Sequence, residues 1–266
     1  MSPSRTCGNK AFASLGAKPM PAGRSRRSRA PASVNAVVER LVLWDIDGTL
    51  VRAGDVAAAV FDRALEAALG HAPAHRISMS GKTDPQIVME YLELMGIASL
   101  QVVPDILDHL ALELAAAQHR LAAEGRVCTG VREVLAGLAA DGRCAQSVLT
   151  GNIAANAALK LTAFGLERWL DLEAGAFGSD HADRRELVPI ALARQRTLRA
   201  RELAPEQVWV IGDTPNDLAC ARAGGVRCLL VATGRYRFDQ LATLGADAVL
   251  ADLGNTDDVL DVLARP

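Results

Sequence analysis

Residues 41–50, "LVLWDIDGTL", set four bulky apolar residues directly before a stretch that contains two aspartates, a glycine and a threonine. An unbroken apolar run of this kind is typical of a strand covered on both faces, as in a parallel sheet. Because strand side chains alternate in direction, Asp45 and Asp47 are expected to point toward the same place at the strand end. Two close carboxylates repel each other, and a bound divalent cation is the simplest way to keep both ionised. The alternative is a solvated turn, since Asp and Gly are common turn residues.

The composition is typical of a soluble globular protein. Half of the 266 residues are apolar and 23% are charged, which suits one large or two modest domains with an ample core. No apolar run approaches the roughly 20 residues that cross a bilayer, and a net charge of -2 argues against a nucleic-acid binder. The five cysteines form no Cys-x-x-Cys pair, so neither a zinc site nor a disulfide framework is expected. We therefore expect a cytoplasmic protein, a monomer or a homodimer, whose partner is a small soluble molecule.

The N-terminal residues 1–36 are predicted to form a disordered extension. They are rich in Ser, Pro, Gly and Arg, and they contain no acidic residue. An Arg-rich, Ser-rich and acid-poor segment shares features with an organellar transit peptide, which makes an organelle the alternative location. A start codon assigned too far upstream accounts for the segment equally well.

Residues 53–125 are predicted to form an all-helical insert. Apolar residues recur there at helical spacing, and Gly or Pro marks the helix ends. The second of these helices has Asp84 as its expected N-cap. No strand pattern occurs in this block, so it predicts a cap domain inserted into a discontinuous core of residues 37–52 and 126–266. The predicted helices span residues 56–69, 84–95 and about 104–123.

Strands and helices alternate from residue 131 onward. This alternation predicts an α/β fold with a Rossmann-like parallel sheet and right-handed crossovers. In such sheets ligands bind at the carboxyl ends of the strands. The predicted strands after the first span residues 144–149, 169–173, 208–212, 226–231 and 247–250. The predicted helices between them span residues 131–140, 153–164, 186–199 and 215–223.

Three polar clusters fall at the carboxyl ends of predicted strands. They are the two aspartates after the first strand, "TGN" at residues 150–152 and "GDTPND" at residues 212–217. Each cluster alone is also typical of a helix N-cap or a turn. Together, at one edge of one sheet, they would bring acids, a hydroxyl and free helix-start amides into one place. That combination indicates a phosphate site with a metal.

These clusters resemble the motifs of the haloacid dehalogenase superfamily. Its first motif, Asp-x-Asp-Gly-Thr, is matched by residues 45–49, and its second, a hydrophobic strand ending in Thr or Ser, is matched by Thr150. Its fourth, Gly-Asp-x-x-x-Asp, is matched by residues 212–217. The helical insert resembles the cap of the phosphoglycolate phosphatase and β-phosphoglucomutase branch. The resemblance covers nearly all of the chain from about residue 38 and implies a core like that of this superfamily, with a helical cap.

The third motif of that superfamily, a lone Lys or Arg before a helix, is matched less clearly. The familiar Lys-Pro form is absent, and Arg184 and Arg185 are the two candidates for binding phosphate. Arg184 is preferred because it closes the loop just ahead of the apolar helix pattern that begins at Leu187. The sequence leaves the choice between the two open.

The resemblance also implies a mechanism. Asp45 would be the nucleophile that forms an aspartyl-phosphate, and Asp47 would be the general acid and then the general base. Magnesium would be held by Asp45, by the backbone carbonyl of Asp47 and by Asp213, with Asp217 positioning that shell. The resemblance thus implies an enzyme that depends on Mg²⁺.

The substrate would be bound by two groups of residues. Thr150, the amides of Gly151 and Asn152, and one arginine would bind the phosphoryl oxygens. Lys82 and Thr83 lie where that branch places its substrate-contacting loop and are candidates for specificity, with a solvated loop as the alternative.

The aspartate at position 47 favours a phosphoester substrate, because the dehalogenases of the superfamily lack an acid there. The resemblance therefore implies a phosphatase acting on a small phosphorylated metabolite, such as a phosphoglycolate-like compound, a sugar phosphate or a nucleotide. Two alternatives are a phosphomutase of the β-phosphoglucomutase type and a non-catalytic relative that binds a phosphorylated ligand.

Overall fold

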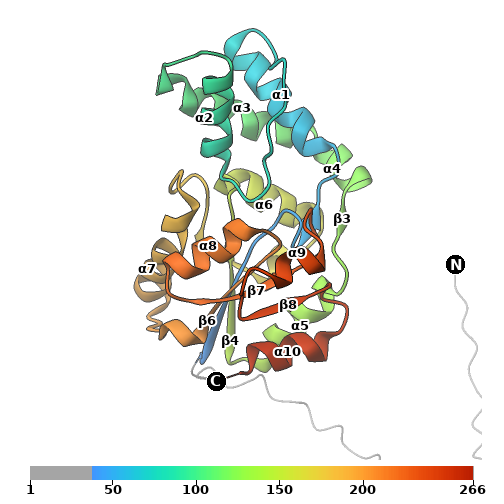
Figure 1. Ribbon diagram of the computed structural model, residues 1–266, viewed down its shortest axis with the longest axis vertical. Helices are drawn as coiled ribbons and strands as arrows, with labels where there is room; N and C mark the ends of the chain where they lie inside the picture. The colour runs from blue at the N-terminus through green and yellow to red at the C-terminus, as the bar shows by residue number, and fades with distance from the viewer. Residues whose placement is uncertain (1–37, 266) are drawn as a thin grey trace, which may run out of the picture. The chain divides into compact units, whose positions relative to one another are not determined.

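The computed structural model describes residues 38–265, so the extension predicted over residues 1–36 lies outside the described residues (Figure 1). Its core strands are β1 (Arg40–Trp44), β4 (Cys144–Leu149), β5 (Asp171–Ala176), β6 (Val208–Gly212), β7 (Arg227–Val231) and β8 (Ala248–Leu250). They form one sheet in the order β5-β4-β1-β6-β7-β8, and every neighbouring pair is parallel. The predicted parallel α/β fold is therefore confirmed.

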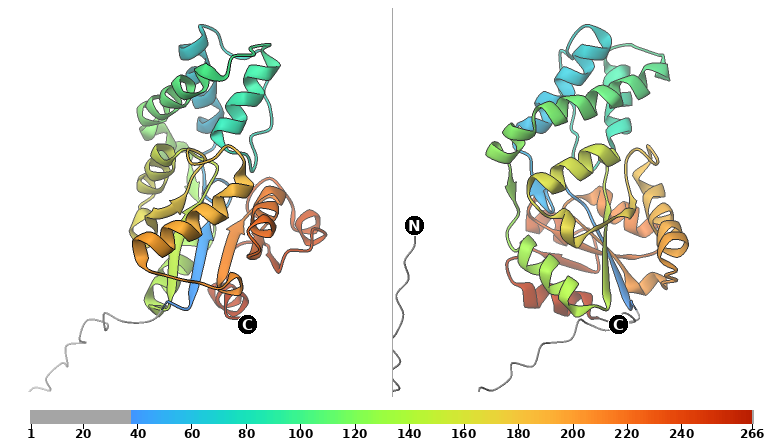
Figure 2. Two further views of the ribbon diagram at one scale, coloured as in Figure 1. Left: turned by 90° about the vertical axis from the view of Figure 1, so that its left-hand side faces the viewer. Right: turned by 180° about the vertical axis from the view of Figure 1, so that it is seen from behind.

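Helices cover both faces of this sheet (Figures 1 and 2). Strand β1 explains why, since Val42 and Trp44 pack into one core cluster while Leu41 and Leu43 pack into the other. Full burial of such a side chain contributes about 1.5–3 kcal/mol, so both faces need a covering layer. One face is covered by α5 (Val131–Asp141), α6 (Ala154–Ala163) and α10 (Thr256–Leu263). The other is covered by α7 (Leu187–Arg199), α8 (Pro215–Ala223) and α9 (Phe238–Ala242).

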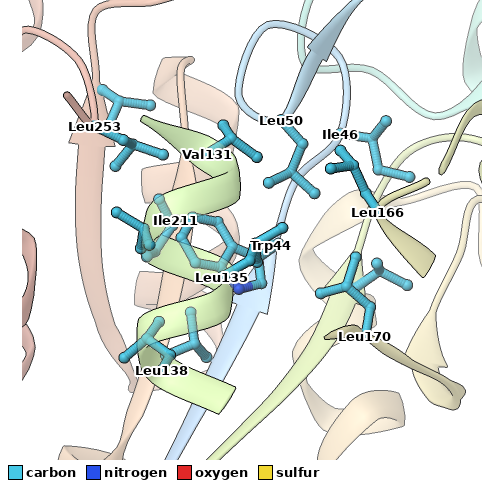
Figure 3. Packing of buried hydrophobic residues seen from close by; sticks show 14 of the residues in the cluster. Trp44, Ile46, Leu50, Val131, Leu135, Leu138, Leu166, Leu170, Ile211 and Leu253 are labelled. Atoms are coloured by element: carbon cyan, nitrogen blue, oxygen red, sulfur yellow. The ribbon is translucent and has the colours of Figure 1, made fainter. Parts of the chain in front are cut away.

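Trp44 shows how the first strand is fixed in this core. Its ring lies fully buried among aliphatic side chains that include Leu135 and Ile211 (Figure 3). Its indole nitrogen donates a hydrogen bond to Gln146 Oε1 at 3.2 Å, so the buried polar atom is satisfied. The strand that leads into the two aspartates is thus anchored by its side chains between β4 and β6, in the middle of the sheet.

We call residues 53–125 the cap segment. Within it the described secondary structure is entirely helical, and its helices pack around a separate core that includes Phe61, Tyr91 and Leu110. The expected third helix is instead two helices, because the chain turns at the buried Ala117, whose amide bonds back to Glu113 and Leu114. Nothing in the local sequence marks this turn. The helices are α1 (Val56–Leu69), α2 (Asp84–Leu94), α3 (Val103–Ala116) and α4 (Gln118–Glu124), with a 3₁₀ turn at Leu100–Val102.

The two linkers between the core and the cap segment pair with each other. Strands β2 (Val51–Arg52) and β3 (Arg126–Val127) form a short antiparallel ladder that the sequence did not reveal. Two-residue strands carry no usable alternation, which explains the omission. Among residues 38–265, none of the helices has both the length and the apolar character needed to cross a membrane.

Candidate active site

The predicted polar clusters meet at one edge of the sheet. Asp45, Thr150 and Asp213 each follow the last residue of β1, β4 or β6, and these three strands are neighbours. A cavity of about 510 Å³ opens between this edge and the cap segment. Among the residues that line it are Asp45, Asp47, Gly151, Asn152, Lys160, Arg184 and Asp213, together with Thr150.

Three buried carboxylates form the base of the site. Oxygens of Asp45, Asp213 and Asp217 lie within 4.8 Å of one another. Burial is the main cause that raises the pKa of Asp45 to about 7 and that of Asp213 to about 8, and the neighbouring acids add to it. Such a trio resists ionising by itself, whereas a hard divalent cation with oxygen ligands would keep all three charged. The donor set therefore fits magnesium.

Asp217 is held in place by its surroundings. Its Oδ2 accepts hydrogen bonds from the backbone N–H of Thr214 at 2.9 Å and from Thr214 Oγ1 at 2.7 Å, and its Oδ1 accepts from Arg184. Both oxygens of Asp217 are thus engaged, which suits a carboxylate that orients its neighbours; its role in positioning the metal shell stays a prediction.

Arg184 lies inside the acidic cluster. Its Nη2 donates to Asp45 Oδ1 at 2.8 Å as well as to Asp217. Burial would lower its pKa, but the carboxylates of Asp217 and Asp45 outweigh burial and raise it, so the guanidinium keeps its charge. Its buried Nε has no acceptor among the described residues. A buried charged donor without a partner is costly, and a phosphate oxygen would satisfy it.

The structure separates the two candidate arginines. Arg185 is exposed and pairs with Asp183 at 2.6 Å, while Arg184 alone of the two reaches the cavity next to Asp45. Of the two candidates left open by the sequence, the structure thus places the preferred Arg184 in the cavity and Arg185 outside it. The reason is local geometry, because the 3₁₀ turn Arg184–Glu186 directs consecutive side chains to different sides.

Asp47 has partners different from those of Asp45. The two line one cavity, but the strand ends at Trp44, so the alternation that predicts a common direction no longer holds at position 47. Lys160 Nζ donates to both carboxylate oxygens of Asp47 at 2.6 and 2.7 Å, and Asn152 Nδ2 donates to Asp47 Oδ2 at 2.7 Å. The expected contact of the Asp47 backbone carbonyl with magnesium stays a prediction.

Lys160 is the site residue that the sequence reasoning missed. It lies on α6, is only 5% exposed, and also donates to Asn152 Oδ1 at 2.7 Å, so its three protons have three acceptors. A lysine on an apolar helix face was one available signal. Composition was another, because after residue 18 the chain has lysine only at positions 82 and 160, and both line the cavity.

The loop after β4 differs in detail from the expectation. Thr150 is fully buried, and its Oγ1 accepts from Asn152 Nδ2 at 2.8 Å and from the Asn152 amide at 3.3 Å. The backbone N–H of Asn152 is thus already engaged. The Asn152 side chain donates to Asp47 and accepts from Lys160. Gly151 is required because a Cβ there would lie 2.0 Å from the carbonyl oxygen of Lys82 in the cap segment.

The two candidate specificity residues also separate. Lys82 lines the cavity and forms an ion pair with Glu90. Thr83 is buried, its hydroxyl donates to the carbonyl of Ala182 at 2.5 Å, and it caps α2 by accepting from the Gln86 amide. The prediction that Thr83 contacts the substrate is therefore contradicted, because its hydroxyl is used in holding the loop.

Asp84 connects the cap segment to the core. It is the first residue of α2 instead of its N-cap, and its Oδ2 accepts the backbone N–H of Ile153 at 2.8 Å. The Asp84 amide donates to the carbonyl of Gly151 at 2.7 Å. A carboxylate is favourable at the N-terminal end of α6, although burial raises its pKa to about 6.

Comparison with known proteins agrees with this geometry. The family model of haloacid dehalogenase-like hydrolases matches residues 42–222. No curated protein is similar enough in sequence to count as a match. Solved structures of similar fold include CbbY from Rhodobacter sphaeroides in complex with phosphate, with 19% identity, 82% of this chain and 96% of that chain covered, and a TM-score of 0.63.

Two further structures show the same fold. A hydrolase from Pseudomonas syringae has 19% identity, covers 85% of this chain and 100% of its own, and gives a TM-score of 0.64. A predicted phosphoglycolate phosphatase from Haemophilus somnus has 18% identity, the same coverage and a TM-score of 0.61. Together with the family match over most of the chain, the site makes the protein an enzyme of the haloacid dehalogenase-like hydrolase family.

Proposed function

We propose that the protein is a magnesium-dependent phosphatase that hydrolyses a small phosphomonoester through an aspartyl-phosphate on Asp45. The observation that carries the proposal is the buried group of Asp45, Asp213 and Asp217 beside a charged arginine whose Nε has no acceptor among the described residues. Similar folds named as a predicted phosphoglycolate phosphatase and as a complex with phosphate support this chemistry.

Asp45 and Asp213 would hold the metal, with Asp217 positioning that shell, and the bound metal would offset the repulsion between the Asp45 carboxylate and the phosphate. Arg184 would donate its free Nε to a phosphoryl oxygen, and the Thr150 hydroxyl would donate to another. Both groups are fixed before substrate arrives, because each already has protein partners. Such preorganised donors favour the redistribution of charge in the transition state.

The reaction would proceed in two steps. An Asp45 oxygen attacks phosphorus, the bond from phosphorus to the leaving oxygen breaks, and Asp47 gives a proton to that oxygen. Asp47 then takes a proton from water as the water oxygen attacks the aspartyl-phosphate, which releases phosphate and restores Asp45. Lys160 and Asn152 would keep Asp47 oriented toward the cavity throughout.

A phosphate-release screen tests the function. Panels of phosphoglycolate, sugar phosphates, nucleoside monophosphates and pyrophosphate would be incubated with the protein and Mg²⁺. We expect release from at least one, and loss of that release on chelation. The exposed Asp105→Asn variant, which keeps the whole cavity, should behave like the unaltered protein. Failure to hydrolyse any phosphomonoester in the panel would contradict the proposal.

A further inference from the structure

Two arginines face each other across the ladder that links core and cap segment. Arg52 of β2 and Arg126 of β3 are register partners in this antiparallel pair. Directly opposite residues lie on the same face, about 4.5–5.5 Å apart at their Cα atoms. Like charges in that position are destabilising, so their presence calls for a compensating interaction.

The protein itself does not neutralise this pair. Arg52 donates from Nε to the carbonyl of Thr233 at 2.7 Å and from Nη2 to the carbonyl of Gly234 at 2.6 Å, which fixes the guanidinium without cancelling its charge. Within residues 38–265, neither arginine forms an ion pair with a carboxylate. Asp55 also lines this part of the cavity but pairs with neither.

The pair lies inside the same cavity as the acidic cluster. Both arginines line that cavity together with Gly234. Gly234 touches both groups, because its carbonyl accepts from Arg52 and a Cβ on it would lie 1.6 Å from Asp213 Oδ2. The acidic cluster and Arg52 therefore meet at Gly234, within reach of one small substrate, and Arg126 lines the same cavity.

We propose that Arg52 and Arg126 form a subsite for a second anionic group of the substrate. The preferred substrates would then be short phosphomonoesters that carry a carboxylate or a second phosphate. This inference rests on the proposed phosphatase function and adds the substrate class to it. Arg52 offers its Nη1 hydrogens, and Arg126 offers an entire guanidinium, which suits the charge-assisted binding of such a group.

Matched substrate pairs test the subsite. The carboxylate arm compares phosphoglycolate with 2-hydroxyethyl phosphate, and the phosphate arm compares propane-1,3-diol bisphosphate with 3-hydroxypropyl phosphate. We expect kcat/KM to favour the anionic member of at least one pair by about tenfold or more. Which arm shows the preference identifies the second group.

The variant Arg126→Gln should reduce this preference to about twofold or less and leave kcat/KM for the neutral esters unchanged. The Arg126 side chain makes no hydrogen bond or ion pair within the described residues, so replacing it should not lower the melting temperature. Arg196→Gln removes the same charge from an exposed position on α7 and should keep the preference. Equal losses of kcat/KM for anionic and neutral esters in Arg126→Gln would overturn the subsite. They would mean that Arg126 contributes only its positive charge to the electrostatic potential of the site.

A binding measurement separates this inference from the proposed function. Calorimetry in Mg²⁺ would compare the affinities of 3-phosphonopropionate and propylphosphonate. Both are phosphonates, which have no ester bond for the enzyme to hydrolyse. Tighter binding of the carboxylated compound, lost in Arg126→Gln, supports the subsite even if no ester is turned over and the phosphatase proposal fails. Equal affinity for the two compounds overturns the subsite even if phosphatase activity is found.

Discussion

At the scale of single residues, the contact between Lys160 and Asp47 distinguishes the two aspartates of the first motif. Asp45 belongs to the buried carboxylate trio, whereas Asp47 is held by the ammonium group of Lys160 and the side-chain amide of Asn152. Removing one member of a buried ion pair is costly, because the other charge is left without a partner. We therefore regard Lys160 as the residue that positions Asp47.

Replacing Lys160 by Met keeps most of the volume but removes the charge and the three hydrogen bonds. If Asp47 acts as general acid, its misplacement should slow hydrolysis of an alkyl phosphate by about 10²-fold or more, with a much smaller effect on a nitrophenyl phosphate. Single-turnover measurement of the phosphorylation step checks this, because the leaving group of a nitrophenyl ester hardly needs a proton.

Lys160→Met should have little further effect in an Asp47→Asn background, since both changes remove the same function. The exposed Arg132→Gln serves as the surface control. Additive losses in the double variant, or equal losses for both leaving groups, would show that Lys160 acts independently of Asp47.

At the scale of elements, the N-terminal ends of α2 and α6 meet through Asp84. Its carboxyl group accepts from the Ile153 amide and lies within the electrostatic influence of Lys160 and Asp47. Burial is the largest cause that raises the pKa of Asp84 from 3.8 to about 6, and the positive charge of Lys160 opposes it. Ionisation of Asp84 therefore costs free energy in the folded protein because the group is buried, even though the hydrogen bond from the Ile153 amide favours the ionised form.

The sign of the pH dependence follows from that raised pKa. Asp84 favours the folded state most below pH 3.8, and this contribution is lost as the pH rises through about 6. Asp84→Asn lacks the titration but can still accept the Ile153 amide. The unfolding free energy of Asp84→Asn should therefore rise relative to that of the unaltered protein as the pH goes from 4 to 7, by up to about 3 kcal/mol. The melting temperature of the variant should rise with it.

Thermal unfolding at several pH values measures this difference, with Asp105→Asn as the exposed control. A difference between Asp84→Asn and the unaltered protein that stays constant from pH 4 to pH 7 would contradict the assigned pKa.

At the scale of the whole molecule, the sequence predicted what long patterns and motifs can carry. The uninterrupted strand runs and the alternation of strands with helices predicted the parallel sheet, and the motif residues that follow β1, β4 and β6 lie together as expected. Elements that depend on tertiary contacts were missed, including the two-residue ladder of β2 and β3 and the turn at Ala117. Helices α9 and α10 were missed because they are too short to show a sustained helical spacing of apolar residues.

The site shows the same division. The sequence motifs identified which residues belong to the site. They did not predict the side-chain directions beyond the end of a strand, so only the structure shows the partners of Asp47 and the different positions of Arg184 and Arg185. Lys160 comes from a helix outside any motif, so the sequence offers only its apolar helix face and the scarcity of lysine as signals, while its burial and contacts show its role.

Metal binding should be visible in the stability of the whole molecule. A cation that binds only the folded state adds about 2.7 kcal/mol to unfolding when present at a hundred times its Kd. Mg²⁺ should therefore raise the melting temperature, and Asp213→Asn should abolish that rise, whereas the exposed Asp257→Asn should retain it. An unchanged melting temperature in millimolar Mg²⁺ would argue against a magnesium site at the carboxylate trio.

In the proposed mechanism, Asp45 becomes phosphorylated during turnover. Rapid acid quenching of the enzyme with its best phosphomonoester in Mg²⁺, followed by mass spectrometry of the peptide around residue 45, measures this directly. We expect one added phosphoryl group on Asp45 within the first turnover, and neither phosphorylated peptide nor phosphate release in Asp45→Asn. Continued phosphate release by Asp45→Asn, with no phosphorylated peptide at any time in the unaltered enzyme, would contradict it.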